Sequence, residues 1–271
     1  MEKFKIVMLA RDCDSTTIVY NFLEKQFGVD TVVFEDIISK KEQFLRRVKL
    51  IGIWRAIGQV FFMILAFSLI KLFSQGKKNK IIRENKLDLT PVPATKIKNI
   101  GKLSSDEGRE LLKSLRPHLL VVNGTRIISK KTLNAVNAPF INIHTGITPA
   151  FRGVHGGYWA VATGNKNLFG TTIHYVDPGV DTGGIIAQVF TDKIKDENFY
   201  TYPYIQYAIV LQKLKEVIDQ FSKNEKPEVM QPVTSESNLW FHPTLFQWIA
   251  KLNRTIVLIP LFFITIFQVN Q

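Results

Sequence analysis

The sequence predicts an α/β fold in which helices cover both faces of a mostly parallel β-sheet. Short apolar runs of strand length alternate with segments that carry helix-start residues, the pattern of strand–helix–strand crossovers. Hydrophobic residues make up 46% of the 271 positions and charged residues 21%, so the chain can bury a large core. This composition excludes disordered, collagen-like and disulfide-rich classes, since Cys13 alone cannot form an internal disulfide.

The first elements are a strand over residues 5–9, a helix that begins at Ser15 and runs to about Phe27, and a strand over residues 29–34. Serine is a frequent N-cap because its side chain accepts a hydrogen bond from the first helical turn. Lys5 interrupts the apolar start of the chain before a signal core can form, so we expect a cytoplasmic location.

The alternation resumes at Ser105, which should cap a helix that leads into an apolar strand over residues 119–122. A helix over residues 129–136 and a strand over residues 140–143 follow. These elements predict a Rossmann-like, mostly parallel sheet.

The pattern changes after Gly170. Two strands, residues 171–176 and 184–190, are joined by a loop with an Asp177-Pro178-Gly179 turn, and a long helix over residues 201–221 closes the domain. We therefore expect one domain over residues 1–223 and a C-terminal extension with an apolar helix over residues 224–271.

The net charge of +12 is concentrated in one segment. Residues 41–86 hold eleven Lys and Arg and two Glu, a net charge of +9, which leaves only +3 for the rest of the chain. These basic residues flank an apolar run instead of alternating with aromatic residues, so we expect no nucleic-acid partner.

Two apolar segments interrupt the α/β pattern, an insertion at residues 50–73 and a tail at residues 255–269. Each uninterrupted apolar stretch is about 15 residues, shorter than the roughly 20 of a spanning helix. A bilayer span is thus the weakest of three interpretations. The segments could instead pack on each other or in a homo-oligomer. They could also form an in-plane patch on an anionic membrane through residues 46–80 and 255–269, with Trp54 and Trp248 at the interface.

Three polar residues form the candidate catalytic group. Asn142 and His144 alternate along the end of a strand, so both side chains project from the same side of the sheet, where ligands bind in open parallel sheets. Asp181 lies in a glycine-rich loop that can fold back over this edge. A neutral imidazole can take a proton, a carboxylate can orient it, and an amide can donate to a developing oxyanion, which together suit acyl transfer.

Each of these residues alone is more often structural. A histidine or asparagine at a strand end commonly satisfies backbone groups, and Asp in an Asp-x-Gly turn commonly forms the turn. The triplet Asp181-Thr182-Gly183 also occurs in aspartic proteases, but those need a second copy in an all-β fold. No His/Cys cluster has metal-ligand spacing, so we expect no metal.

Taken jointly, the motifs resemble the folate-dependent formyltransferases. The matching features are Asn142-x-His144, Pro149, the aromatic-Arg-Gly at residues 151–153, and the run from Asp177 to Gly183. That family includes glycinamide ribonucleotide, methionyl-tRNA and sugar-amine N-formyltransferases, and the resemblance covers residues 95–200 best. It implies that the chain uses 10-formyltetrahydrofolate as co-substrate and a small-molecule amine as acceptor.

The resemblance also implies residue roles. Asn142 would hold the formyl oxygen, His144 would move protons between the amine and the folate nitrogen, and Asp181 would orient His144. The residues that would bind the folate are Gly124, Thr125, Arg126, Ile127, Ile128, Asp177, Gly179 and Val180. The residues that would bind the acceptor are Arg11, Arg152, Gly153 and His155. His118 and His174 match no family position and are expected to be structural.

Departures from the family pattern bear on the acceptor. The glycine-rich phosphate loop of the purine enzyme is replaced by residues 10–15, which hold two carboxylates and no glycine, and residues 225–271 do not match the β-barrel domain of the transfer-RNA enzyme. His144-Thr145-Gly146 stands in place of the common His-Pro-Ser. We therefore expect an amino sugar or sugar-lipid precursor as acceptor, with phosphoribosylglycinamide as the alternative and a catalytically inactive formyltransferase-like binding protein as the alternative from another class.

Overall fold

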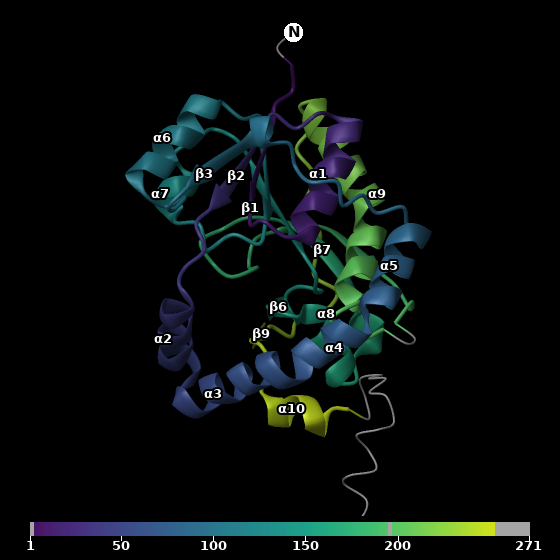
Figure 1. Cartoon of the computed structure of the whole chain (residues 1–271). Helices are drawn as coiled ribbons and strands as arrows, with labels where there is room; N and C mark the ends of the chain where they lie inside the picture. Colours follow the sequence, from purple (N-terminus) through teal and green to yellow (C-terminus); the bar gives the residue numbers. More distant parts are fainter. Residues whose placement is uncertain (1–2, 195–196, 253–271) are drawn as a thin grey trace, which may run out of the picture.

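The computed structural model describes residues 3–194 and 197–252, which form a seven-stranded sheet with helices on both faces (Figure 1). The strand order is β3-β2-β1-β4-β5-β7-β8. The strands of this sheet are β1 (Ile6–Ala10), β2 (Thr31–Glu35), β3 (Ile97–Ile100), β4 (Leu119–Asn123), β5 (Phe140–His144), β7 (Gly170–Tyr175) and β8 (Ile185–Phe190).

The sheet is mostly parallel, as predicted. The pairs from β3 to β5 are parallel, whereas β7 runs antiparallel to β5 and β8 antiparallel to β7. A short loop can join β7 to β8 because antiparallel neighbours need no helical crossover. The register between β5 and β7 sets Asn142 opposite His174 and His144 opposite Thr172.

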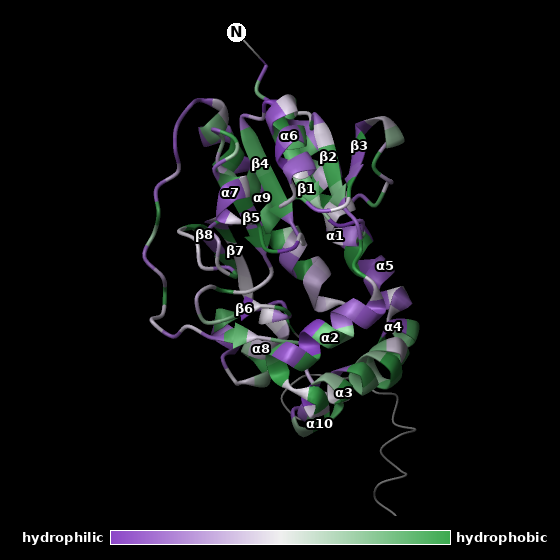
Figure 2. Ribbon diagram, turned by 90° about the vertical axis from the view of Figure 1, so that its left-hand side faces the viewer, coloured by the Kyte–Doolittle hydropathy of each residue, from purple (hydrophilic) through white to green (hydrophobic). Residues whose placement is uncertain are grey.

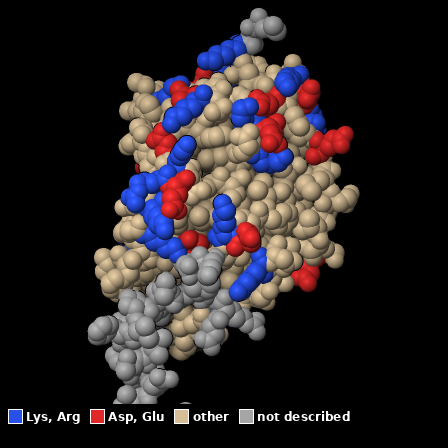
Figure 3. Space-filling view, turned by 90° about the vertical axis from the view of Figure 1, so that its right-hand side faces the viewer, with Lys and Arg blue, Asp and Glu red and all other residues tan. Residues whose placement is uncertain are grey.

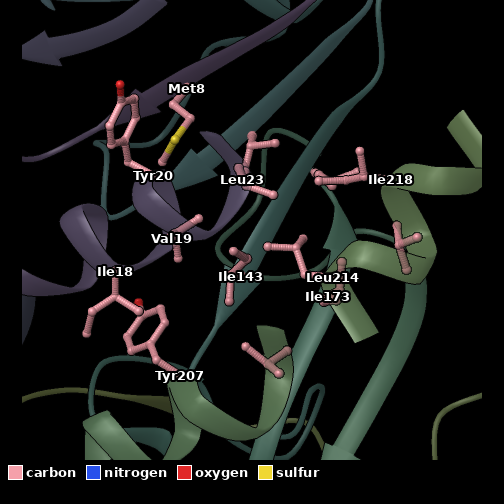
Figure 4. Packing of buried hydrophobic residues seen from close by; sticks show 14 of the residues in the cluster. Met8, Ile18, Val19, Tyr20, Leu23, Ile143, Ile173, Tyr207, Leu214 and Ile218 are labelled. Carbon is pink, nitrogen blue, oxygen red and sulfur yellow. The ribbon is translucent and has the colours of Figure 1, made fainter. Parts of the chain in front are cut away.

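Helices pack on the sheet because its central strands are apolar on both sides. In β1, Ile6 and Met8 belong to the core under α1 and α9, where Figure 4 shows Met8 beside Tyr20 and Leu23 of α1. Val7 and Leu9 belong to the core on the other face, under α6. The helices of this part are α1 (Asp14–Gln26), α6 (Asp106–Leu115), α7 (Lys130–Leu133), α8 (Gly156–Ala162), α9 (Tyr202–Ser222) and the 3₁₀ turns η2 (Ala94–Lys96) and η3 (Lys166–Leu168).

Some predicted boundaries are confirmed and others are wrong. Ser105 caps α6 and accepts a hydrogen bond from the amide of Gly108 at 3.0 Å, as expected. In contrast, α1 begins at Asp14 with Cys13 as N-cap, so the predicted start at Ser15 is late. The strand β3 was missed because its middle residues are exposed, which leaves no apolar run to recognise.

The insertion between β2 and β3 is helical, as predicted, and longer than its apolar pattern suggested. Its middle segments join end to end into one helix of 21 residues, Ile53–Phe73, that contains a π-helical turn. The helix extends beyond the predicted apolar stretch of about 15 residues because it includes Arg55 and Lys71, the charged residues on either side of that stretch. Within the helix, Gln59 donates to the carbonyl of His242 at 2.6 Å. The insertion comprises α2 (Lys40–Ile51), α3 (Ile53–Phe61), η1 (Phe62–Phe67), α4 (Ser68–Phe73) and α5 (Gln75–Glu84).

This helix is long and apolar enough to cross a membrane by length and composition, but one side packs on the protein. Phe62 is fully buried and contacts Phe199 and Trp248, with ring centroids 4.9 and 5.9 Å apart. Trp248 belongs to α10 (Leu245–Ala250), which lies beside α3 (Figures 1 and 2). Trp248 is buried here, so its predicted place at a membrane interface is wrong. The insertion thus packs on α10, whereas its predicted packing on the apolar tail at residues 255–269 concerns a segment outside the described residues and stays a prediction.

The extension after α9 returns to the sheet domain. Its strand β9 (Leu239–Trp240) pairs with β6 (Arg152–Gly153) in a small second sheet that the sequence did not reveal, since each strand has two residues. The domain boundary at residue 223 stays a prediction.

On the face that includes α5 and α9, basic and acidic side chains are interspersed (Figure 3).

Candidate active site

The candidate catalytic residues meet at the carboxyl end of β5. Asn142 and His144 project from the same side of this strand, and Asp181 reaches them from the loop between β7 and β8. The Asn142 amide nitrogen donates to Asp181 Oδ1 at 3.2 Å, and His144 Nδ1 lies 3.4 Å from Asp181 Oδ2. The predicted grouping of the three side chains is therefore present in the structure.

Asp181 is held in place by its loop. Its backbone adopts a left-handed conformation with φ +50°, and its Oδ2 accepts a hydrogen bond from the amide of Gly153 at 2.9 Å. Arg152 donates to the carbonyl of Val180 at 3.2 Å, which ties β6 to the same loop. Asp177 accepts from the Thr182 hydroxyl at 2.7 Å and from the Gly179 amide at 3.0 Å. Asp177, Gly179 and Val180, expected to bind the folate, thus form one hydrogen-bonded turn next to Asp181.

His174 contacts this group, a position that the sequence did not predict, while its expected structural role stays a prediction. Its Nε2 lies 3.1 Å from the Asn142 amide nitrogen and 3.5 Å from Asp181 Oδ1. Its Nδ1 lies 2.7 Å from the Tyr175 carbonyl oxygen, which only accepts, so Nδ1 must carry a proton. In the neutral ring, Nε2 then accepts from Asn142. His118, the other histidine without a family match, accepts from the Lys5 amide at 3.1 Å through Nδ1.

The hydrogen bonds of His144 determine its tautomer. Its Nε2 lies 2.6 Å from the carbonyl oxygen of Phe151, so Nε2 donates and a neutral ring presents an unprotonated Nδ1 to Asp181. Burial lowers the pKa of His144, although the Asp181 carboxylate opposes this effect. Burial acts to raise the pKa of Asp181, but His144, His174 and the Gly153 amide together lower it to about 2. At neutral pH the pair is a carboxylate beside a neutral imidazole.

The predicted folate-binding loop follows β4. Gly124 adopts φ +76°, a conformation that favours glycine, where the chain turns out of the sheet. The Arg126 side chain pairs with Glu35 at 3.2 Å, and the Arg126 amide donates to the other Glu35 oxygen at 3.1 Å. Ile128 is buried, whereas Ile127 is 63% exposed. Glu35 thus fixes the loop that contains Thr125 and Arg126. The Ile127 side chain gives this loop an exposed apolar surface.

The predicted acceptor residues are spread over two sides of the site. Arg11 follows β1 and lies beside the Gly124 loop, with its amide donating to Asn123 at 3.3 Å. Gly153 has no room for a side chain, because a Cβ there would lie 2.3 Å from the Trp240 carbonyl oxygen. Arg11 and the Arg152–Gly153 pair therefore approach the site from different elements.

Two histidines form a pair near α8: His155, which was predicted to bind the acceptor, and His242, which was not predicted. His155 bonds to the Tyr202 hydroxyl at 3.1 Å and to Nδ1 of His242 at 2.9 Å. Burial, followed by the neighbouring His242, lowers the pKa of His155 well below its usual value. Burial, with the positive charges of Arg47 and Arg11, lowers the pKa of His242 to about 4. His242 was missed because it lies in the C-terminal extension, outside every recognised motif.

His155 lines a cleft of about 600 Å³ that the insertion helps to build. Lys71 and Lys78 come from the insertion, and Asp14 comes from the start of α1. Asp14 accepts from Lys78 Nζ at 2.6 Å and from the Tyr204 hydroxyl at 2.5 Å. Within residues 3–194 and 197–252, no group of three or more His, Cys, Asp or Glu side chains could hold a metal ion.

A family model and curated relatives match parts of this chain. The family model described as "Formyl transferase" matches residues 67–202. The methionyl-tRNA formyltransferase of Thermodesulfovibrio yellowstonii is 28% identical over 153 residues, which cover 56% of this chain and 48% of that protein. The phosphoribosylglycinamide formyltransferase of Bacillus subtilis is 42% identical over 82 residues, 29% of this chain and 42% of that protein. The matched regions thus span about half of these relatives or less.

The fold also matches solved structures. A sugar N-formyltransferase from Shewanella sp. FDAARGOS_354 superposes with a TM-score of 0.55 and 15% identity, over 93% of this chain and 88% of that one. At this identity the match concerns the fold alone.

Proposed function

Because the chain belongs to the formyl transferase family, we propose that it is an enzyme that moves a formyl group from 10-formyltetrahydrofolate to a primary amine. The observation that carries this proposal is the contact of Asn142, His144 and Asp181 at the carboxyl end of β5. Asp181 comes from a loop 37 residues beyond His144, so the fold has brought together a base, an orienting carboxylate and an amide donor.

His144 is the proposed proton carrier. The amine nitrogen would attack the formyl carbon, and the bond from that carbon to the folate nitrogen would break as the new carbon–nitrogen bond forms. The proton lost by the amine would pass through His144 to the leaving nitrogen. Burial keeps the imidazole neutral and able to accept, and the Asp181 carboxylate would stabilise the imidazolium that results.

Asn142 is the proposed donor to the formyl oxygen. Both hydrogens of its amide are engaged, one by Asp181 and one by His174. To donate to the substrate, Asn142 would exchange one of these bonds for the formyl oxygen, whose negative charge grows in the transition state. His174 and Asp181 hold the amide plane and would position it for this exchange.

The proposed folate site lies between two loops. The backbone of Gly124–Ile128 would recognise the pterin ring, with Ile127 in contact with its face, and the turn at Asp177, Gly179 and Val180 would form the second wall. Arg126 is engaged by Glu35 and Gly101, so its side chain would fix the loop instead of pairing with the ligand.

We propose an amino sugar or sugar-lipid precursor as acceptor, bound in the cleft lined by His155 with help from Arg11, Arg152 and Gly153. A phosphate at the start of α1 would lie beside the carboxylate of Asp14, which argues against the phosphate position expected for a ribonucleotide. Phosphoribosylglycinamide is the second candidate, because the Bacillus subtilis enzyme of that name is 42% identical over 82 residues. A cytoplasmic location is part of this proposal.

The test is an assay of tetrahydrofolate release by the purified full chain. The protein is incubated with 10-formyltetrahydrofolate and either glycinamide ribonucleotide or a panel of nucleotide-linked amino sugars. Turnover with a sugar amine that His144→Ala abolishes, while tetrahydrofolate binding persists, supports the proposal. Turnover only with glycinamide ribonucleotide selects the second candidate. Tetrahydrofolate binding without turnover on either acceptor class contradicts enzymatic transfer to them and favours the inactive, folate-binding alternative.

A further inference from the structure

The helix Ile53–Phe73 exposes an apolar face. Its buried side chains, among them Phe62, Ala66 and Ile70, line one side of the helix and belong to the same apolar cluster as residues of α8 and α10. The opposite side of the helix, called the outer face here, is exposed: the side chain of Trp54 is 83% exposed and that of Leu72 is 66% exposed. The residues of this outer face are Trp54, Phe61, Ile64, Leu65, Leu69 and Leu72.

The exposed apolar surface continues beyond this helix. Phe246 of the neighbouring α10 is 80% exposed and Leu50 at the end of α2 is 70% exposed. Figure 2 shows hydrophobic residues gathered on α3 and α4, at the end of the molecule away from the N-terminus. Single exposed apolar residues are normal on soluble proteins, but a contiguous patch of this kind marks an interaction surface.

The charges around the outer face point to an anionic partner. The insertion carries a net charge of +9. Lys49, Arg55 and Lys71 are exposed and form no ion pair with the residues that the structure describes. Of the other insertion residues close to this face, Arg46 pairs with Glu42 and Lys78 with Asp14. An apolar surface with a basic border and an exposed tryptophan suits the interface of an anionic bilayer.

We propose that the outer face docks on the surface of an anionic phospholipid bilayer, with the helix lying in the plane of the membrane. A transmembrane orientation would require Phe62 and Ile70 to leave the protein core and Gln59 to lose its hydrogen bond to His242. A second copy of the chain on this face would bring two insertions of +9 together, and like charges at that distance repel.

Docking in this orientation would hold the active-site cleft near the lipid surface. The helix that bears the outer face also contributes Phe67 and Lys71 to the cleft lined by His155. An acceptor attached to a lipid would therefore reach the cleft without leaving the membrane. This consequence rests on the proposed function, but docking itself does not, because it depends only on the exposed surface of the insertion and α10.

The experiment is co-sedimentation of the purified full chain with vesicles of neutral phosphatidylcholine or of phosphatidylcholine with phosphatidylglycerol. The test variant is Leu65→Ser with Leu72→Ser, and the matched control is Ile37→Ser with Val233→Ser, two equally apolar and exposed positions away from the outer face. Circular dichroism and thermal unfolding establish that each variant is folded, and the oligomeric state is measured by light scattering. The emission of Trp54 on vesicle addition, with Trp54→Phe as reference, reports contact of this face with lipid.

We expect the wild type and the control to bind the anionic vesicles, with weaker binding in high salt and to neutral vesicles. The Leu65/Leu72 variant should bind at least about tenfold more weakly, because each replacement of leucine by serine removes several apolar carbon groups from the contact with lipid. Three results would overturn the proposal: no binding by the wild type, equal binding by the variant, or a stable dimer that the variant dissociates and that binds no vesicles. Equal binding would assign any membrane affinity to another part of the chain. Activity on soluble acceptors is not a readout here, so failure of this proposal leaves the proposed function untouched.

Discussion

Replacement of Asp181 by Asn should lower the proton affinity of His144. The carboxylate Oδ2 lies 3.4 Å from His144 Nδ1, and both side chains are largely buried. At an effective dielectric constant of about 20, a unit charge at this distance stabilises the imidazolium by about 5 kcal/mol. If half of the positive charge has developed in the transition state, the loss is about 2.5 kcal/mol, which corresponds to a fall in kcat on the order of 10²-fold.

The change in proton affinity can be measured without an acceptor. The pKa of His144 is followed by NMR through its Hε1 resonance, which is assigned with His144→Gln. We expect Asp181→Asn to lower this pKa by at least about one unit, since one unit corresponds to 1.36 kcal/mol. The control is Asp88→Asn, because the pKa of Asp88 is also held at about 2, by Lys25 and Thr90, on a remote part of the surface. An unchanged His144 pKa in Asp181→Asn would refute the assigned role of the carboxylate.

Three further predictions concern packing and pH. Gly146→Ala should reduce turnover at least about tenfold and stability by about 1–3 kcal/mol, because its Cβ would lie 2.6 Å from His144 Nε2; unchanged kinetics and urea midpoint would argue against this steric account. Phe62→Ala should lower the free energy of unfolding in urea by about 3–5 kcal/mol or speed hydrogen exchange in the insertion, because Phe62 is fully buried. Phe61→Ala should lower it by less than about 0.5 kcal/mol, because Phe61 is exposed, and equal effects would contradict the assigned orientation of the helix. Because the folded-state pKa of His242 is lowered to about 4, the unfolded chain binds a proton there first as pH falls, and stability should drop by up to about 3 kcal/mol between pH 6.5 and 4. Denaturant unfolding of His242→Gln should show a shallower pH dependence, and an identical profile would exclude this histidine as a source.

The grouping of Asn142, His144 and Asp181 could be predicted because it depends on local rules. The two strand residues are two positions apart, so strand geometry places them on one side. The glycines after Asp181 allow the loop to turn back toward the sheet. The sequence could not predict His174 at the site, because that depends on the register between β5 and β7, which sets Asn142 opposite His174.

The same distinction applies to the insertion. The predicted apolar stretch ended at Arg55 and Lys71 because charged residues interrupt an apolar run, yet the helix includes both. The sequence also could not predict the role of the polar Gln59 within this helix. Its amide is satisfied by the carbonyl of His242, 183 positions away, and local sequence carries no information about that partner. The edge strand β3 was missed for a related reason, since Lys98 and Asn99 are exposed and its pairing with β2 is visible only in three dimensions.

The position of the insertion has an evolutionary consequence. The chain leaves the sheet at Glu35 and returns in β3, which pairs directly with β2, so the insertion is the crossover between two adjacent strands. A crossover can be lengthened, shortened or exchanged without changing the order of the strands around it. Selection can therefore change the surface that the insertion presents, while the strand that carries Asn142 and His144 remains unchanged.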